Sequence, residues 1–277
     1  NYDYQNSYNI YMELKKNFSD YENFSIDLLS QYFDFLGEFY FYLGKWEEAR
    51  QWSIKTMEIC KNYDELSYLV SESRIAFIDF YNKGKYDRKK FESIRSKFSS
   101  INFSFYRRRF LIESAMIAFV NKEYDYALDI LEEDSLLKDE YPSFYLDSLK
   151  KILLYTVRND EESRINLEKL GEELKSENLI SAKILYNVIM GNKSYKDGNY
   201  YKAFNYISEA IDLVFRIVSD IPEVEFQISF IKRTRVDSIK KLFFDIIEKV
   251  FGEKLDYCLV ENLNAKNNID KYFDYSS

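Results

Sequence analysis

Apolar residues recur at spacings of three and four along most of the chain, which is the period of an amphipathic helix. The interval from Tyr2 to Phe18 carries such a stripe and predicts a leading helix. Two further helices are predicted at Ser104 to Val120 and at Ser143 to Val157. The second follows Pro142, a residue that suits the start of a helix. Helices therefore account for both the beginning and the middle of the chain.

Glycine and proline are scarce, with 7 Gly and 2 Pro in 277 residues. Sandwiches and barrels need many turns, and turns draw on these two residues. Hydrophobic residues make up 46% of the chain and charged residues 31%, which provides for both a core and a polar surface. The sequence therefore predicts an all-α protein with a helix content above roughly 70% and no sheet.

Composition also disfavours several kinds of chemistry. The chain has no His, which removes the usual imidazole base and most metal sites. Cys60 and Cys258 lie far apart and are expected to be reduced thiols, which fits a cytoplasmic location. The net charge of -8 repels nucleic-acid backbones, and no apolar run approaches the roughly 20 residues of a membrane span. We expect no cofactor, no metal, no nucleic-acid partner and no membrane contact.

A helical-hairpin pattern recurs along the chain, most clearly at Ser30 to Tyr63 and at Ile184 to Ile217. The first copy is marked by Phe33, Leu36, Gly37, Tyr40, Gly44, Trp46 and Ala49. The second is marked by Met190, Gly191, Gly198, Tyr200, Ala203 and Ala210. Weaker copies lie between them, and the turns between paired helices align at Gly44, Gly84, Lys122, Asn159 and Gly198. Successive turns are 37 to 40 residues apart, and a period of this length is typical of stacked helical repeats.

These positions resemble the tetratricopeptide repeat, in which two antiparallel helices meet at a short turn. The resemblance implies that Gly37 and Ala49 let the two backbones approach and that Trp46 is a largely buried wedge. It also implies that Gly44 takes the positive φ that closes a helix. Stacked pairs bury the apolar faces that one pair leaves open. We therefore expect a right-handed α-α superhelix of about five TPR-like helical hairpins with flanking helices.

The end of the repeats is predicted at the break Ile221-Pro222, followed by one long or twice-bent helix from Glu223 to Phe251. This ending resembles the end of the repeat region in large bacterial multidomain signalling proteins, where such repeats follow a nucleotide-binding ATPase module. The chain has no Gly-rich phosphate-binding loop, so ATPase chemistry is not expected within it. The predicted organisation is 1–29 leading helices, 30–220 repeat array, 221–260 capping helix and 261–277 partly ordered tail.

In tetratricopeptide arrays the first helix of each pair lines the concave face, where partners bind. Carried over by position, the resemblance assigns partner contacts to Glu38, Tyr42, Arg74, Tyr81, Arg109, Phe119, Asn192 and Tyr195. Arginines at two adjacent units predict a preference for an anionic segment. The alternative is that these side chains pack against neighbouring helices. The chaperone-tail-binding subfamily has Lys and Asn where this chain has Asp34 and Glu38, so that ligand is not expected.

Other charged clusters give no catalytic pattern. The carboxylate pairs lie after turns or on polar helix faces, where the helix dipole favours negative charge: Glu47-Glu48, Glu132-Glu133, Glu161-Glu162 and Glu172-Glu173. The run Arg107-Arg108-Arg109 is expected to be a solvated helix face.

The function predicted is therefore a non-enzymatic scaffold or regulatory domain in bacterial signalling, with a protein, a peptide or a neighbouring domain as its partner. One alternative is the peptide-sensing domain of a cytoplasmic transcription regulator. A helical enzyme with carboxylate chemistry is a third hypothesis, which the placement of the acids opposes. The oligomeric state stays open, with a homodimer as one alternative.

Overall fold

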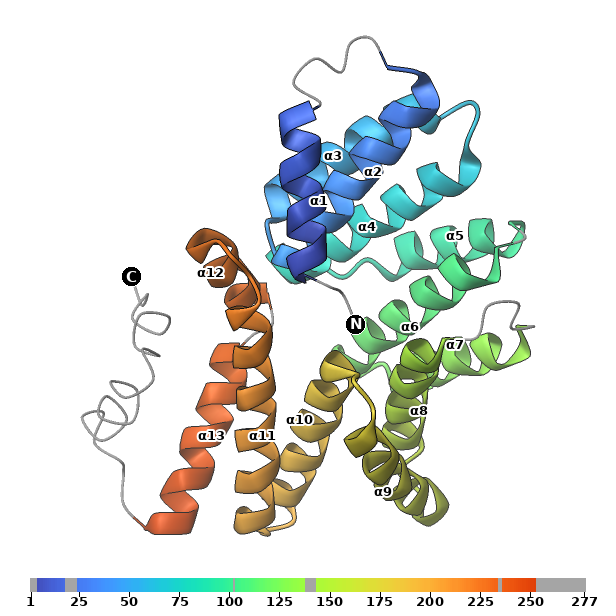
Figure 1. The fold of residues 1–277 in the computed structure, drawn as a ribbon. Helices are drawn as coiled ribbons and strands as arrows, with labels where there is room; N and C mark the ends of the chain where they lie inside the picture. Colours follow the sequence, from blue (N-terminus) through green and yellow to red (C-terminus); the bar gives the residue numbers. More distant parts are fainter. Residues whose placement is uncertain (1–3, 18–23, 102, 138–142, 234–235, 253–277) are drawn as a thin grey trace. The chain divides into compact units, whose positions relative to one another are not determined.

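The structure, a computed structural model, describes residues 4–17, 24–101, 103–137, 143–233 and 236–252. Within these ranges 86% of the residues are helical and none forms a strand, which confirms the all-α prediction. The 13 helices pack against their neighbours (Figure 1). Their bounds are α1 Tyr4–Asn17, α2 Ile26–Leu43, α3 Trp46–Cys60, α4 Glu65–Lys83, α5 Arg88–Ser99, α6 Ser104–Val120, α7 Tyr124–Leu136, α8 Phe144–Arg158, α9 Glu161–Ser176, α10 Ile180–Lys196, α11 Tyr200–Ser219, α12 Val224–Arg233 and α13 Val236–Phe251.

The chain forms two compact units, Asn1–Ala182 and Lys183–Ser277. Helices α1 to α9 belong to the first unit and α11 to α13 to the second, while α10 crosses the boundary near its beginning. This boundary lies within the span 30–220 that was predicted for the repeat array.

Side-chain caps explain where several helices of the first unit begin. Ser25, Asp64, Asp87, Ser143 and Asp160 each accept a hydrogen bond from the backbone N–H three residues ahead. Such caps satisfy donors that have no partner within the helix. Each of these helices therefore has its start encoded by the residue before it.

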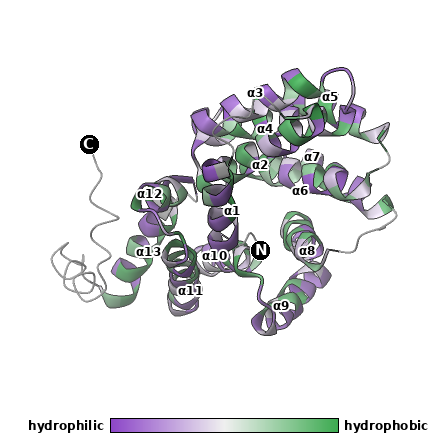
Figure 2. Cartoon of the chain, turned by 45° about the horizontal axis from the view of Figure 1, so that its top comes forward, coloured by the Kyte–Doolittle hydropathy of each residue, from purple (hydrophilic) through white to green (hydrophobic). Residues whose placement is uncertain are grey.

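Consecutive helices of the first unit pack as hairpins, α2 with α3, α4 with α5, α6 with α7 and α8 with α9. The first helices of successive hairpins also contact one another, since α2 packs on α4, α4 on α6 and α6 on α8. Figure 2 shows that these helices carry both polar and apolar residues. Packing between hairpins buries apolar residues that a single pair of helices leaves open. The arrangement is that of a repeat-like helical protein.

The turns between paired helices share one backbone conformation. Gly44, Gly84 and Gly198 have φ values of 76°, 63° and 75°, and Lys122 and Asn159 have 63° and 49°. In this left-handed region the chain leaves the helix and its last carbonyls find N–H partners. The positive φ predicted for Gly44 is confirmed, and the other four aligned turn residues share it.

Small residues allow the helices of a hairpin to approach closely. A Cβ atom on Gly37 would lie 2.7 Å from Nη1 of Arg74 and 3.1 Å from Oγ of Ser53. Ala49, on the facing helix, is fully buried. In the second unit a Cβ atom on Gly191 would lie 2.5 Å from Cδ1 of Ile207. The predicted close approach at Gly37 is confirmed, and part of the space is taken by an arginine from α4.

Trp46, predicted as a largely buried wedge, is partly buried and packs against residues of α2 and α4. Its ring stacks on Tyr81 of α4, with centroids 5.8 Å apart and planes 11° apart, and meets the edge of Phe41 at 5.8 Å. It lies in the first turn of α3, at the end of the hairpin. Trp46 therefore joins two successive hairpins.

The predicted leading helix is present as α1, which packs on α2. The ring of Tyr11 stacks on Phe39 with centroids 4.7 Å apart, and the hydroxyl of Tyr40 donates to that of Tyr11 at 3.2 Å. Helix α1 thus covers an aromatic side of α2. This is the role of a terminal cap in a stack of helices.

In the second unit, α11 packs on α13 around a core that includes Ala203, Ile207 and Ile246. The segment predicted as one long or twice-bent helix forms two helices, α12 and α13, and α13 is followed by Gly252 with φ 71°. The predicted tail at 261–277 lies outside the described residues, as does Cys258. In the described part of the chain, no helix combines the length and apolar character that crossing a membrane requires.

Candidate partner-binding face

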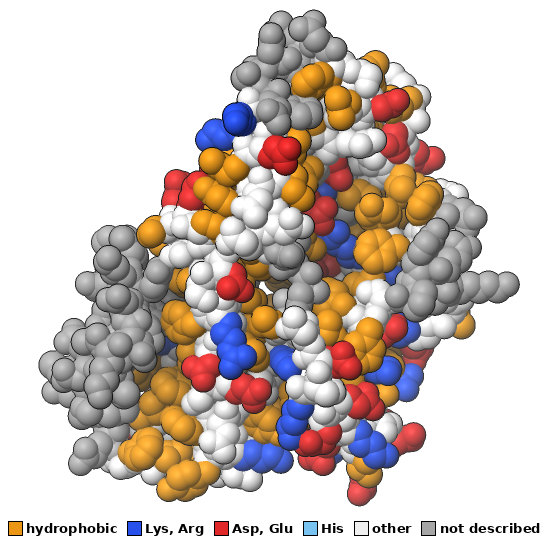
Figure 3. All heavy atoms as spheres, viewed as in Figure 1, with side chains coloured by type: hydrophobic (Ala, Val, Ile, Leu, Met, Phe, Trp, Pro, Cys, Tyr) orange, Lys and Arg blue, Asp and Glu red, His pale blue; other side chains and the backbone are white. Residues whose placement is uncertain are grey.

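The side chains of α2, α4 and α6 form a partly exposed polar and aromatic surface in the first unit. We call it the α2–α6 face and define it by Asp34, Glu38, Tyr42, Tyr81, Tyr106, Arg109, Glu113 and Met116. All eight side chains are partly exposed. Figure 3 shows acidic, basic and hydrophobic side chains beside one another around these helices.

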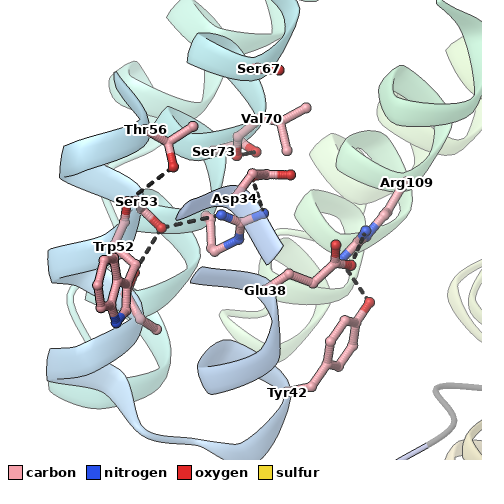
Figure 4. A network of polar contacts seen from close by, with 12 residues as sticks. Asp34, Glu38, Tyr42, Trp52, Ser53, Thr56, Ser67, Val70, Ser73 and Arg109 are labelled. Atoms are coloured by element: carbon pink, nitrogen blue, oxygen red, sulfur yellow. Dashed lines mark hydrogen bonds and ion pairs between the residues drawn. The ribbon is translucent and has the colours of Figure 1, made fainter. Parts of the chain in front are cut away.

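Arg109 joins α2 and α6 across the intervening α4. Its Nη1 donates to Oε1 of Glu38 at 2.8 Å, and its Nη2 donates to the hydroxyl of Tyr42 at 2.6 Å (Figure 4). The guanidinium also lies 5.4 Å from the centroid of the Tyr42 ring. The structure therefore brings together three residues that the repeat pattern assigned to a partner-binding face.

Arg74 occupies a different environment, because only 4% of it is exposed. Its Nη2 donates to Oδ1 of Asp34 at 2.8 Å, and its Nη1 donates to Oγ of Ser53 at 3.3 Å. The guanidinium lies in the space left by Gly37. Arg74 thus ties α2, α3 and α4 together and presents no charge at the surface.

Tyr81 links α4 to α6, since its hydroxyl donates to Oε1 of Glu113. The stacking of its ring on Trp46 holds the tyrosine from the other side. Glu113 lies four residues after Arg109, so the two point to the same side of α6. Glu113 is not among the site residues predicted from the repeat pattern, although its spacing of four from Arg109 is a signal that could have found it.

The run Arg107-Arg108-Arg109 is not the solvated face that was expected. Arg107 donates to Glu133 at 2.7 Å, and Arg108, 3% exposed, donates to Asp134 at 3.2 Å and to Asp147 at 2.6 Å. Successive helical residues point about 100° apart, so the three arginines reach different helices. Only Arg109 belongs to the α2–α6 face.

Electrostatics of the face follow from these pairs. Burial raises the pKa of Glu38, but the charges of Arg109 and Arg74 and the hydrogen bond from Arg109 outweigh it, so its pKa lies below the usual value. Burial lowers the pKa of Arg109, and Tyr42, Glu38 and Glu113 raise it by more. Both groups are therefore charged at neutral pH, and each neutralises the other. This pairing removes the basis for the predicted anionic preference.

The cavity at the α2–α6 face offers little room for a small ligand. A space of about 30 Å³ beside the face is lined by Phe41, Val70, Ser73, Arg74, Phe77, Phe98, Tyr106, Arg109 and Phe110. This is about the volume of one water molecule. A depression of about 480 Å³ lies elsewhere, at the turn between α3 and α4, and is lined by Lys61, Asn62, Tyr63, Glu65, Tyr68, Leu69 and Lys97. The α2–α6 face can therefore act only through its surface.

Of the remaining predicted site residues, Phe119 lies on α6 three residues after Met116, and the other two belong to the second unit. Phe119 packs on Tyr124 at the end of the third hairpin, with centroids 5.7 Å apart. Asn192 is exposed on α10 in the second unit. Tyr195, on the same helix, packs on Tyr200 at 5.6 Å and on the core of that unit. The structure does not place either α10 residue on the α2–α6 face.

The paired carboxylates are distributed over several helices. Glu47 and Glu48 lie in the first turn of α3, and Glu161 and Glu162 in the first turn of α9. Glu133 pairs with Arg107, while Glu132 pairs with Arg158 at 3.2 Å. Over the described ranges, no group of three or more Cys, Asp or Glu side chains could hold a metal ion.

Fold and face together define an all-helical, repeat-like protein. No protein-family model matches the sequence, and no curated protein matches it either.

Proposed function

We propose that this chain is a non-enzymatic binding module that engages a protein or peptide through the α2–α6 face. The observation that carries the proposal is Arg109, which joins the first helices of two non-adjacent hairpins through Glu38 and Tyr42. In helical repeat proteins, such helices form extended surfaces that take up peptide segments. The tetratricopeptide superhelix remains the architecture that we propose for the array.

The face is held in one arrangement before any partner arrives. Two hydrogen bonds and a ring contact fix Arg109, while Trp46 and Glu113 fix Tyr81. A surface that is already ordered loses less side-chain entropy on binding. Tyrosine and arginine are also the residues that most often dominate binding energy at protein interfaces.

The biological setting follows from the resemblance alone. We propose a cytoplasmic scaffold or regulatory segment in bacterial signalling, whose partner is a protein or a neighbouring domain. A second candidate is the peptide-sensing domain of a transcription regulator. It is favoured by Asn192, whose exposed amide on α10 could clamp a peptide backbone.

The proposal can be tested with peptides selected from a random library displayed on phage. A photoreactive residue is placed at Met116, on the α2–α6 face, or at Ile54, which is exposed on α3, a helix that carries no residue of the face. We expect the selected peptides to cross-link at position 116 and not at position 54. Cross-linking at position 54 alone, or failure of the library to yield any binder, would contradict the proposal.

A further inference from the structure

We propose that the α2–α6 face selects a segment carrying Lys or Arg beside an apolar residue. This inference names the partner class for the face and therefore rests on the proposed function. It reverses the preference expected from the arginines alone, because their partners in the structure are carboxylates of the same face.

Negative charge exceeds positive charge on the face. Asp34, Glu38 and Glu113 supply three carboxylates around the two guanidiniums of Arg74 and Arg109. The Arg74 side chain is only 4% exposed, whereas those of Asp34 and Glu38 are 29% and 30% exposed. An incoming segment therefore meets more carboxylate than guanidinium.

The carboxylates also keep acceptor capacity for a new cation. A carboxylate can accept about four hydrogen bonds. Within the described residues, Asp34 receives one side-chain donor from Arg74, Glu38 one from Arg109 and Glu113 one from Tyr81. A Lys ammonium or Arg guanidinium would thus find acceptors without breaking an existing pair.

An anionic segment would be disfavoured on the same face. If it reached the N–H groups of Arg109 that stay unused, it would lie beside the carboxylate of Glu38, whose oxygen is 2.8 Å from the guanidinium. It would also approach Asp34 and Glu113, and like charges brought together at an interface are costly. The pairs already formed on the face therefore work against an acidic partner.

Tyrosine side chains on the face add aromatic contacts for a cationic segment to those of the carboxylates. Tyr42, Tyr81 and Tyr106 are partly exposed on the same face. Burial, followed by the charges of Asp34 and Glu38, raises the pKa of Tyr106, so its ring stays neutral beside these carboxylates. Neutral aromatic rings attract Lys and Arg through their faces and also pack against apolar side chains. The same residues can thus read both features of the segment.

The variant Glu113→Gln tests this inference, because it removes the negative charge of Glu113 while the amide oxygen of Gln can still accept from Tyr81. Glu58→Gln is the matched control, since it removes the same charge from the exposed side of α3. The ligand is the tightest peptide selected from the phage library, made once with its Lys and Arg residues and once with Gln in their place. Melting curves of both variants establish that the fold is kept.

We expect the selected peptides to be enriched in Lys and Arg over Asp and Glu. Glu113→Gln should weaken the binding of the basic peptide about three- to tenfold, while Glu58→Gln changes it less than about twofold. Glu113→Gln and the wild type should bind the Gln-substituted peptide with equal affinity, because the charge interaction that this double-mutant cycle measures is then absent.

Three results separate this inference from the proposed function. Acidic or uncharged peptides that cross-link at position 116 would overturn the inference and leave the function standing. Equal affinity of the basic peptide for Glu113→Gln and the wild type would also overturn the inference. Peptides that cross-link only at position 54 would overturn the function and the inference together.

Discussion

Buried charges at the scale of single residues hold the helices of the first unit in register. The side chain of Asp134 is fully buried, 3.2 Å from Nε of Arg108 and 2.9 Å from Nζ of Lys150. These three residues come from α7, α6 and α8. A buried charge that loses its partner is costly, because neither water nor another charge replaces the lost contact.

Asp134→Ala should therefore lower the free energy of unfolding by about 3 to 5 kcal/mol, since it removes the buried carboxylate that Arg108 and Lys150 share and leaves Arg108 with Asp147 alone. Glu132→Ala is the matched control. The pair of Glu132 with Arg158 is largely exposed, and such pairs contribute about 0 to 1 kcal/mol. Urea denaturation of the two variants measures the difference. An Asp134→Ala protein as stable as Glu132→Ala would show that this buried cluster does not hold the three helices.

The sequence predicts the contacts of small residues better than those of charged residues. Gly37 and Ala49 predict a close contact between two helices, because larger side chains would not fit there, and the structure confirms this contact. Arg107, Arg108 and Arg109 gave a wrong expectation of a solvated run. Which helix each of them reaches depends on neighbours that are distant in the sequence.

At the scale of elements, the turns between paired helices share one backbone conformation. All five aligned turn residues have positive φ, although only three of them are glycine. Spacing and scarce glycines were sufficient to place the turns, because glycine adopts this conformation without a steric penalty. The segment after Ile221 was less predictable, since its apolar pattern continues through both α12 and α13.

Lys122→Gly should raise the free energy of unfolding by about 1 kcal/mol, because a left-handed φ costs an L-residue about that much. Gly84→Ala is the opposite substitution at the equivalent turn. A Cβ atom at this position would have no heavy atom within 4 Å. The expected decrease of about 1 kcal/mol in the free energy of unfolding of Gly84→Ala therefore comes from the backbone conformation alone. Thermal unfolding followed by circular dichroism measures both. A destabilised Lys122→Gly protein would contradict the strain assigned to this turn.

The whole first unit is expected to respond to acid through ion pairs between its hairpins. The pKa of Glu38 is lowered from 4.5 in the folded protein, so the folded state binds a proton there less readily than the unfolded chain. The stabilising contribution of Glu38 is therefore fully present above about pH 4.5 and is lost as the pH falls through the lowered pKa. Burial raises the pKa of Asp79, but Arg50 and Lys90 lower it by more. The pKa of Asp160 is lowered chiefly by its capping hydrogen bonds with Ser163 rather than by an ion pair, and both groups add to this loss.

Glu38→Gln isolates the contribution of Glu38, because the variant cannot form the charged pair with Arg109. The stability difference between wild type and variant should be constant from neutral pH down to about pH 5 and should shrink below about pH 4.5. Denaturant titrations at a series of pH values measure it. A difference that grows in acid would mean that the Glu38–Arg109 pair does not stabilise the fold.

Hydrogen–deuterium exchange of the chain with and without a selected peptide tests the central claim, that the α2–α6 face is the binding surface of the molecule. Amides protected by the peptide should lie in α2 and α6, around Glu38 and Arg109, because binding suppresses local opening of the segments it contacts. Exchange in α9, on which no part of the face lies, should stay unchanged. Protection confined to α9 or to the second unit, with α2 and α6 unaffected, would contradict the account.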